Sequence, residues 1–133
     1  MFSCVVLFTA SGIIAATAEK IPDEIVINGT AYKKDIKGPV DFNHGKHAKE
    51  MKIPCTECHH EYKDGKNVWV EGQPVKKCVE CHNPDKSEGN VKKLMLAYHK
   101  NCQGCHKKEK GKEGVNPPSN KCENCHIDEK KAK

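Results

Sequence analysis

The sequence contains no arginine, so all 23 of its basic residues are lysines. Aromatic residues make up only 5% of the 133 residues, and the mean hydropathy is −0.77. A chain of this length forms one small domain, and so few large apolar side chains give it a marginal core. We therefore expect something other than side chains to supply much of the core.

Long hydrophobic runs are equally scarce. The apolar run at residues 5–16 is too short to span a bilayer, and the Ala-Thr-Ala that ends it fits a signal-peptidase cleavage pattern. The sequence therefore predicts a signal peptide over residues 1–18 and an exported domain over residues 19–133, in the periplasm. Cys4 would be lost with the signal, and no stable membrane insertion is expected.

The most informative feature that is present is a five-residue pattern, C-x-x-C-H, which occurs four times. This is the attachment motif of c-type haem. Two thiols on one helical turn can form thioethers to the haem vinyl groups, and the adjoining histidine then lies under the iron. Four copies predict four covalent haem c groups. The predicted attachment sites are Cys55, Cys58, Cys78, Cys81, Cys102, Cys105, Cys122 and Cys125.

The histidine count matches the motif count. Four of the eight histidines belong to the motifs, and four haems with histidine on both faces of each iron would use all eight. Histidine on both faces favours a low potential and leaves no iron position for substrate, so the sequence predicts an electron carrier and not an enzyme. The motif histidines are His59, His82, His106 and His126, and the others are His44, His47, His60 and His99.

Three other functions fit parts of the pattern. A multihaem reductase would need one iron with an open position, which the supply of histidines disfavours. A zinc protein or a disulfide scaffold could use paired cysteines, but neither explains a histidine after every second cysteine. A subunit of an extracellular electron-conducting assembly remains a further alternative, although no extra assembly segment is visible.

The expected fold is a small multihaem cytochrome, mainly short α-helices and loops with a small N-terminal β element, wrapped around a four-haem core. Trp69 is expected to pack in this core, and Asn90 is a favourable N-cap for the clearest helix. The expected elements are a strand at 24–28 with a return strand near 31–33, helical turns at 44–51, a loop or short hairpin at 62–77, a helix beginning after residue 90, and a loop at 111–120.

Charge is distributed unevenly along the chain. Residues 19–75 carry a net charge of −1, whereas residues 76–133 carry a net charge of +6. Most lysine-rich segments are simply solvated surface. A charge this modest is a poor explanation for nucleic-acid binding, but a cluster of one sign can steer an acidic protein partner.

Three segments carry a family resemblance. His44-Gly-Lys-His47, Cys55-Thr-Glu-Cys58-His59-His60 and Tyr98-His99-Lys-Asn-Cys102-Gln-Gly-Cys105-His106 resemble the tetrahaem cytochromes c3 of sulfate-reducing bacteria. The similarity extends over essentially the whole mature chain. Many family members use a longer C-x-x-x-x-C-H motif for the second and fourth haems, whereas all four motifs here are C-x-x-C-H.

The resemblance implies a pairing of the axial histidines. It gives haem 1 His59 and His44, haem 2 His82 and His60, haem 3 His106 and His47, and haem 4 His126 and His99. It also implies a carrier that takes electrons from hydrogenase to membrane-bound cytochrome complexes in anaerobic sulfate respiration. Docking is expected at the lysine-rich region of haem 4.

Overall fold

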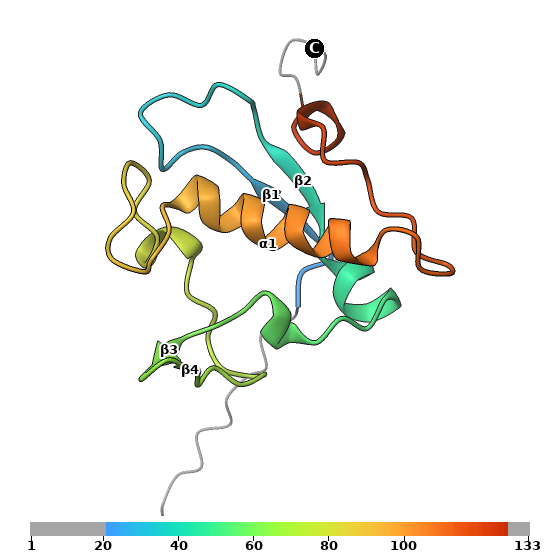
Figure 1. Ribbon diagram of the computed structural model, residues 1–133, viewed down its shortest axis with the longest axis horizontal. Helices are drawn as coiled ribbons and strands as arrows, with labels where there is room; N and C mark the ends of the chain where they lie inside the picture. Colours follow the sequence, from blue (N-terminus) through green and yellow to red (C-terminus); the bar gives the residue numbers. More distant parts are fainter. Residues whose placement is uncertain (1–20, 128–133) are drawn as a thin grey trace, which may run out of the picture.

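The computed structural model describes residues 21–127, which are arranged around a single long helix, α1 (Leu94–Glu109). Figure 1 shows α1 crossing the middle of the molecule, with the other segments disposed around it. The predicted signal peptide and cleavage site lie outside the described residues. Among the described residues, no helix is long and apolar enough to cross a membrane.

The N-terminal β element is a two-stranded antiparallel ribbon. Strand β1 (Glu24–Ile27) pairs with β2 (Val40–Asn43), with Ile25 opposite Phe42. The predicted first strand is present, but the return strand expected near 31–33 is wrong. The chain first makes a longer loop, in which Asp35 Oδ1 accepts hydrogen bonds from the backbone N–H groups of residues 37 and 38.

A second, shorter hairpin follows the first cysteine motif. It comprises β3 (Tyr62–Lys63) and β4 (Lys66–Asn67), joined by Asp64-Gly65 with φ of 50° and 76°. Positive φ at both central residues is typical of the tight turn that matches strand twist, and Asp-Gly is a favoured pair for it. The hairpin expected within residues 62–77 is therefore present, but it is confined to residues 62–67.

The helical segments are mostly short. The turn expected at 44–51 is the π-helix η1 (Lys46–Glu50), and the helix expected after Asn90 is α1. Asn90 is not its N-cap, because Lys93 occupies that position and residues 88 and 91 form a β-bridge instead. The remaining turns are the 3₁₀ helices η2 (Cys55–Glu57), η3 (Cys78–Glu80) and η4 (Cys122–Asn124).

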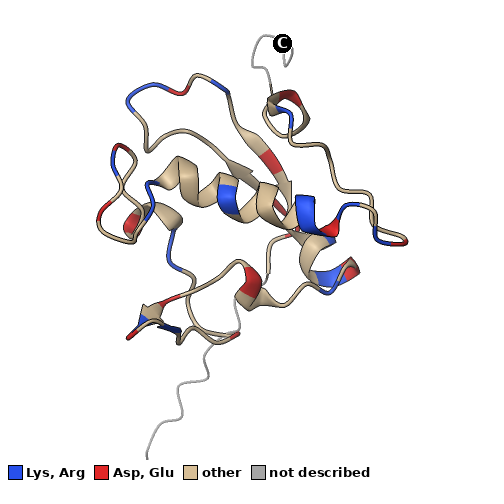
Figure 2. Ribbon diagram, in the orientation of Figure 1, with Lys and Arg blue, Asp and Glu red and all other residues tan. Residues whose placement is uncertain are grey.

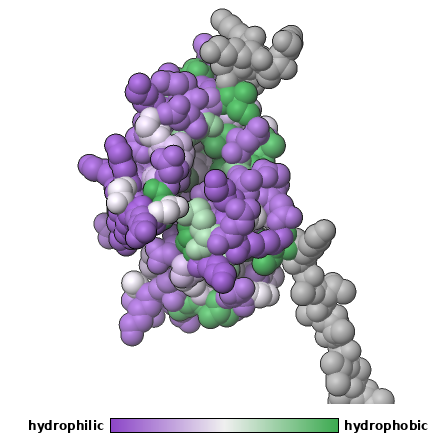
Figure 3. Space-filling model, turned by 90° about the vertical axis from the view of Figure 1, so that its right-hand side faces the viewer, coloured by the Kyte–Doolittle hydropathy of each residue, from purple (hydrophilic) through white to green (hydrophobic). Residues whose placement is uncertain are grey.

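The described chain has almost no polypeptide core. Its buried hydrophobic side chains are Trp69 and Leu94, at 8% and 3% exposure. Many large apolar side chains are exposed, including Ile36 at 73% and Val26 at 59%. Figure 3 shows apolar patches between hydrophilic side chains on one face of the molecule. Such a surface suits a chain that packs on a large apolar cofactor, as the expected fold class requires; the four-haem core itself stays a prediction.

Candidate haem sites

The cysteine motifs share one backbone geometry. In η2, η3 and η4, the carbonyl oxygen of the first cysteine accepts hydrogen bonds from the N–H groups of the second cysteine and of the histidine. For the first motif these N···O distances are 3.2 Å from Cys58 and 2.8 Å from His59 to the oxygen of Cys55. The third motif forms part of α1. Each motif is therefore a helical turn that brings both thiols and the imidazole together.

Each motif histidine faces one histidine from outside the motifs. The pairs are His44 with His59, His60 with His82, His47 with His106, and His99 with His126. The ring centroids in these pairs are 6.2, 6.0, 6.2 and 6.2 Å apart, respectively. These pairs coincide with the axial pairs that the resemblance implies, and we number the sites 1 to 4 by their cysteine motif. Their role as iron ligands stays a prediction.

The separation of the rings suits a metal ion between them. A metal–imidazole bond is about 2 Å long and the ring centre lies about 1 Å beyond the bonded nitrogen, so two opposed imidazoles on one ion have centres about 6 Å apart. All four pairs meet this requirement. The donor set and its spacing therefore fit a haem iron with histidine on both faces.

One histidine of each pair has its ring orientation fixed by the backbone. His44 Nδ1 lies 2.8 Å from the carbonyl oxygen of residue 22, and His47 Nδ1 lies 2.7 Å from that of residue 43. His82 and His126 have the same contact at 2.7 and 2.8 Å, with the carbonyl oxygens of residues 92 and 38. A carbonyl oxygen only accepts, so Nδ1 donates its proton and Nε2 is left for a metal.

Local packing explains the glycine between His44 and His47. A Cβ on Gly45 would come 2.5 Å from the Asp23 Oδ1 atom, and the Gly45 N–H donates to the Asp23 carbonyl oxygen at 2.8 Å. Asp23 also forms an ion pair with Lys49 on η1. This close approach joins the residues before β1 to the turn that carries both histidines.

Helix α1 contributes to two sites. His99 faces site 4 and His106 belongs to site 3. Seven residues correspond to almost two helical turns, so the two histidines lie on nearly the same side, with Cα atoms about 10 Å apart along the axis. The start of α1 also meets the second motif, because the Leu94 N–H donates to the Asn83 carbonyl oxygen at 2.9 Å.

Two of the motif histidines have lowered pKa values. Burial, with the nearby His44 and His60, lowers the pKa of His59. Burial and the facing His47 likewise lower the pKa of His106. Since a metal binds the neutral imidazole, both shifts favour ligation at neutral pH.

The four motifs converge near Cys102 on α1. One side of Cys102 is exposed, yet the chain surrounds it closely enough for desolvation to raise its pKa to about 11. Cys58, Cys125 and Cys78, one from each of the other three motifs, raise the pKa of Cys102 by smaller amounts. Cys102 is therefore close enough to one predicted attachment point of each other motif to interact with it electrostatically, although these residues are far apart in sequence.

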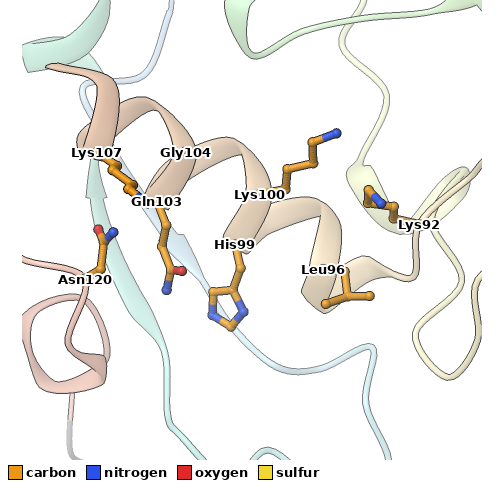
Figure 4. Close-up of a pocket in the computed structure, with 8 residues that line it drawn as sticks. All are labelled: Lys92, Leu96, His99, Lys100, Gln103, Gly104, Lys107 and Asn120. Carbon is orange, nitrogen blue, oxygen red and sulfur yellow. The ribbon is translucent and has the colours of Figure 1, made fainter.

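A cavity of about 500 Å³ adjoins site 4. Figure 4 shows the His99 and Gln103 side chains of α1 extending from the same part of the helix, with Asn120 nearby. The volume is in the range of pockets for small ligands and cofactors. The residues that line it are Lys92, Leu96, His99, Lys100, Gln103, Gly104, Lys107 and Asn120.

Within the described part of the chain, the histidines lie in opposed pairs and not in a cluster with other metal-binding side chains. Between residues 21 and 127, no three histidine, cysteine or acidic side chains converge on a possible metal position. Structural zinc sites need about four such ligands, whereas the histidines here come in opposed pairs. Among the described residues, no disulfide joins any two of the eight motif cysteines.

A chain with so little core of its own, built around cysteine motifs and opposed imidazoles, has the features of a multihaem c-type cytochrome. The model of the class III cytochrome c family matches residues 22–132, and the chain therefore belongs to this family. It is an electron-transfer cytochrome of the haem c type.

Individual relatives agree with this assignment. A cytochrome c3 of Maridesulfovibrio salexigens is 36% identical over 117 residues, which cover 82% of this chain and 97% of the relative. A cytochrome c3 of Desulfovibrio desulfuricans is 30% identical, over 79% of this chain and 94% of the relative. A nine-haem cytochrome c from a strain of the same species is 28% identical, over 79% of this chain but only 34% of that protein.

Sequence reasoning missed the residues that orient the ligands. Asn43 Oδ1 accepts a hydrogen bond from the Lys46 N–H at 2.7 Å, and the Asn43 carbonyl oxygen accepts one from His47. The Asn67 side chain bonds to the backbone on both sides of His60. The asparagine before His44 and the one after Asp-Gly were visible signals, because asparagine favours caps and turns.

Proposed function

We propose that the chain is a periplasmic, low-potential electron carrier with four covalently bound haem c groups, each with two histidine ligands. The observation that carries the proposal is the set of four opposed imidazole pairs, with ring centroids 6.0–6.2 Å apart. The iron of haem c supplies one-electron oxidation and reduction when the group is bound. With histidines on both faces, the chain offers no open position for substrate, so the proposal excludes catalysis at iron.

The residues of the chain divide this work. In each site two cysteines would anchor the cofactor, the adjoining histidine would bind one face, and the second histidine the other. Hydrogen bonds from Nδ1 to carbonyl oxygens hold the Nε2 atoms of His44, His47, His82 and His126 towards the facing ring. Such bonds fix the tautomer and raise the basicity of the ligand, which favours the oxidised metal.

The proposed partners are hydrogenase as electron donor and membrane-bound cytochrome complexes as acceptors. Support comes from the charge of the C-terminal half and from its position around site 4. Lys92, Lys100 and Lys107 line the cavity beside His99, and Figure 2 shows lysines along α1. We propose export through a signal peptide at residues 1–18, because covalent haem attachment takes place outside the bacterial cytoplasm.

A second candidate function is a role as one module of a larger electron-conducting assembly. It is favoured by the similarity to part of a nine-haem cytochrome c, of which this chain covers 34%. On this alternative the sites are the same, and only the partner differs.

An intact mass combined with visible and near-infrared spectra of the native protein tests the proposal. We expect a chain that begins at Glu19 with four haems attached, and spectra of low-spin iron with two histidine ligands. A mass with fewer haems, or a band typical of methionine ligation, would contradict the proposal. Rapid reduction by hydrogen with a catalytic amount of hydrogenase would support the proposed donor.

A further inference from the structure

We propose that Asn67 is a positioning residue that holds the backbone around His59 and His60, so that these adjacent imidazoles serve two different irons. The inference rests on the proposed function, because it concerns the ligands of sites 1 and 2. The hydrogen bonds of the Asn67 side chain go to backbone groups, at residues 59, 61 and 69.

The two histidines present a geometric problem. They are neighbours in sequence, yet His59 faces His44 with ring centroids 6.2 Å apart, and His60 faces His82 with ring centroids 6.0 Å apart. The interplanar angles within these pairs are 73° and 90°. The backbone between the two residues must therefore hold one conformation that satisfies both partners, since rotation at this peptide would disturb both sites together.

The Asn67 side chain bridges the backbone on both sides of this peptide. Its Nδ2 donates to the His59 carbonyl oxygen at 3.2 Å, and its Oδ1 accepts from the Glu61 N–H at 3.0 Å. The same Oδ1 accepts from the Trp69 N–H at 3.1 Å. One planar amide thus joins residue 59, residue 61 and residue 69, and His60 is the residue enclosed between the first two.

The surrounding contacts extend this arrangement to the rings. The Trp69 ring lies 5.2 Å from His59, and the Tyr62 ring lies 5.2 Å from His60. Trp69 is buried, and its indole N–H donates to a backbone carbonyl oxygen at residue 74. Figure 1 shows the β3–β4 hairpin, on which Asn67 lies, beside the chain that leaves the first motif.

Asparagine is suited to this role for a chemical reason. Its carbonyl oxygen has two lone pairs for two N–H groups, and its amide nitrogen carries hydrogens for a carbonyl oxygen. Aspartate keeps the two acceptor contacts but loses the donor, and it places a negative oxygen beside the His59 carbonyl oxygen. Alanine loses all three. The two substitutions therefore form a graded series at one position.

The experiment compares the wild-type holoprotein with Asn67→Ala and Asn67→Asp. Electron paramagnetic resonance of the oxidised protein resolves the low-spin irons, and variants His44→Ala, His60→Ala, His47→Ala and His99→Ala assign one signal to each site. In Asn67→Ala we expect the signals of sites 1 and 2 to shift or broaden and those of sites 3 and 4 to stay. Carbon monoxide uptake by the reduced protein should rise from almost none to as much as one per altered site. Asn67→Asp should give a smaller change at the same two sites.

Asn124→Ala is the control, because the side chain of this asparagine also donates to a carbonyl oxygen, that of Ser119, as well as to the Ser119 hydroxyl, but it lies within the fourth motif, away from sites 1 and 2. It should leave sites 1 and 2 unchanged. An unchanged spectrum of Asn67→Ala, or an equal change at all four sites, would overturn the inference. If Asn67→Ala does not mature, Asn67→Asp decides: a shift confined to sites 1 and 2 supports the inference and no shift overturns it. Failure of the proposed function would show differently, as missing low-spin signals in the wild-type protein.

Discussion

The two halves of the molecule position their histidines by different means. In the N-terminal half the histidines lie on turns and on the short helix η1. The Asn67 side chain bonds to the backbone on both sides of His60, and the Asp23 side chain forms an ion pair with Lys49 on η1. In the C-terminal half the regular spacing of α1 places His99 and His106 on nearly the same side. A helix supplies its own register, whereas a turn that carries adjacent ligands needs side chains to fix its shape.

The halves also differ in charge. Residues 19–75 have a net charge of −1, while residues 76–133 have a net charge of +6. Close to the first motif, burial and the nearby Glu71 carboxylate raise the pKa of Cys55. Three lysines line the cavity beside site 4 instead. The two halves therefore present different electrostatic surroundings to their sites, and the proposals of proton coupling near site 1 and of docking near site 4 make different predictions.

The largest expected effect comes from removing a ligand that links the two halves. His47 lies on η1 in the N-terminal half but faces His106 on α1. Replacing His47 by alanine should open one iron, raise its midpoint potential, and allow the reduced protein to bind about one carbon monoxide per chain. Carbon monoxide titration of the wild-type and variant proteins measures this, and the wild-type protein should bind little at neutral pH.

The outcome also tests the pairing. If His47→Ala alters the signal of site 3 alone, the two halves meet at that site. Strong carbon monoxide binding by the unmodified protein would instead show an open iron and favour a reductase. Loss of a signal that His44→Ala, His60→Ala or His99→Ala also removes would contradict the pairing of His47 with His106.

A smaller effect is expected from reversing charge in the lysine-rich half. Replacing three exposed lysines near site 4 by glutamate should slow electron transfer from hydrogenase at low salt, because the positive charges that would steer an acidic partner are replaced by negative charges that repel it. The rate for the wild-type protein should fall steeply with salt, since the Debye length shortens from about 30 Å at 0.01 M to about 10 Å at 0.1 M. The three are Lys107, Lys108 and Lys121.

The matched control makes the same charge change in the N-terminal half. Three exposed lysines of the loop between β1 and β2 are replaced by glutamate, and stopped-flow reduction measures both variants. This second set should slow the reaction less. Equal rates for the two variants, or a rate indifferent to salt, would place docking elsewhere on the surface. The control residues are Lys33, Lys34 and Lys37.

The sequence predicts the chemistry of the sites better than the fold that holds them. The four motifs and the histidine count pointed to the cofactor, and family membership supports haem c. The motif matches one helical turn, because its histidine follows the first cysteine by four residues, and the histidine N–H donates to the carbonyl oxygen of that cysteine. The assignment of partners, such as His47 with His106, came from resemblance and not from the residues themselves.

The elements that were misplaced depend on contacts distant in sequence. Strand β2 starts at Val40, and its neighbour Pro39 accepts a hydrogen bond from the Ile127 N–H at 2.8 Å. The strand is therefore fixed partly by the C-terminal motif, which no local pattern at residues 31–33 could reveal. Asn90 has favourable capping chemistry, but residues 88 and 91 form a β-bridge around it, and α1 begins only at Leu94.

Site 3, which joins the two halves, should also differ in its electronic structure. The imidazole planes of His47 and His106 are 18° apart, whereas the other three pairs lie at 72°, 73° and 90°. Nearly parallel planes separate the two iron orbitals that interact with the ligand rings, and perpendicular planes leave them almost equal in energy. We expect one rhombic low-spin signal and three highly anisotropic ones. Paramagnetic resonance of the oxidised protein checks this, and four similar signals would contradict it.

The smallest expected effect concerns protons at site 1. Adding an electron makes the site more negative and raises the pKa of a nearby acid, so reduction takes up a proton and the midpoint potential falls as pH rises. The slope is at most about 59 mV per pH unit for one proton per electron. Glu71, beside Cys55, adds a negative charge there, so Glu71→Gln should raise the potential of site 1 and reduce its pH dependence.

Glu113→Gln, in the exposed loop after α1, is the control for the Glu71→Gln variant. Titrations from pH 6 to 8 compare the two, and equal shifts would show that proton coupling does not depend on the acidic side chain of the N-terminal half.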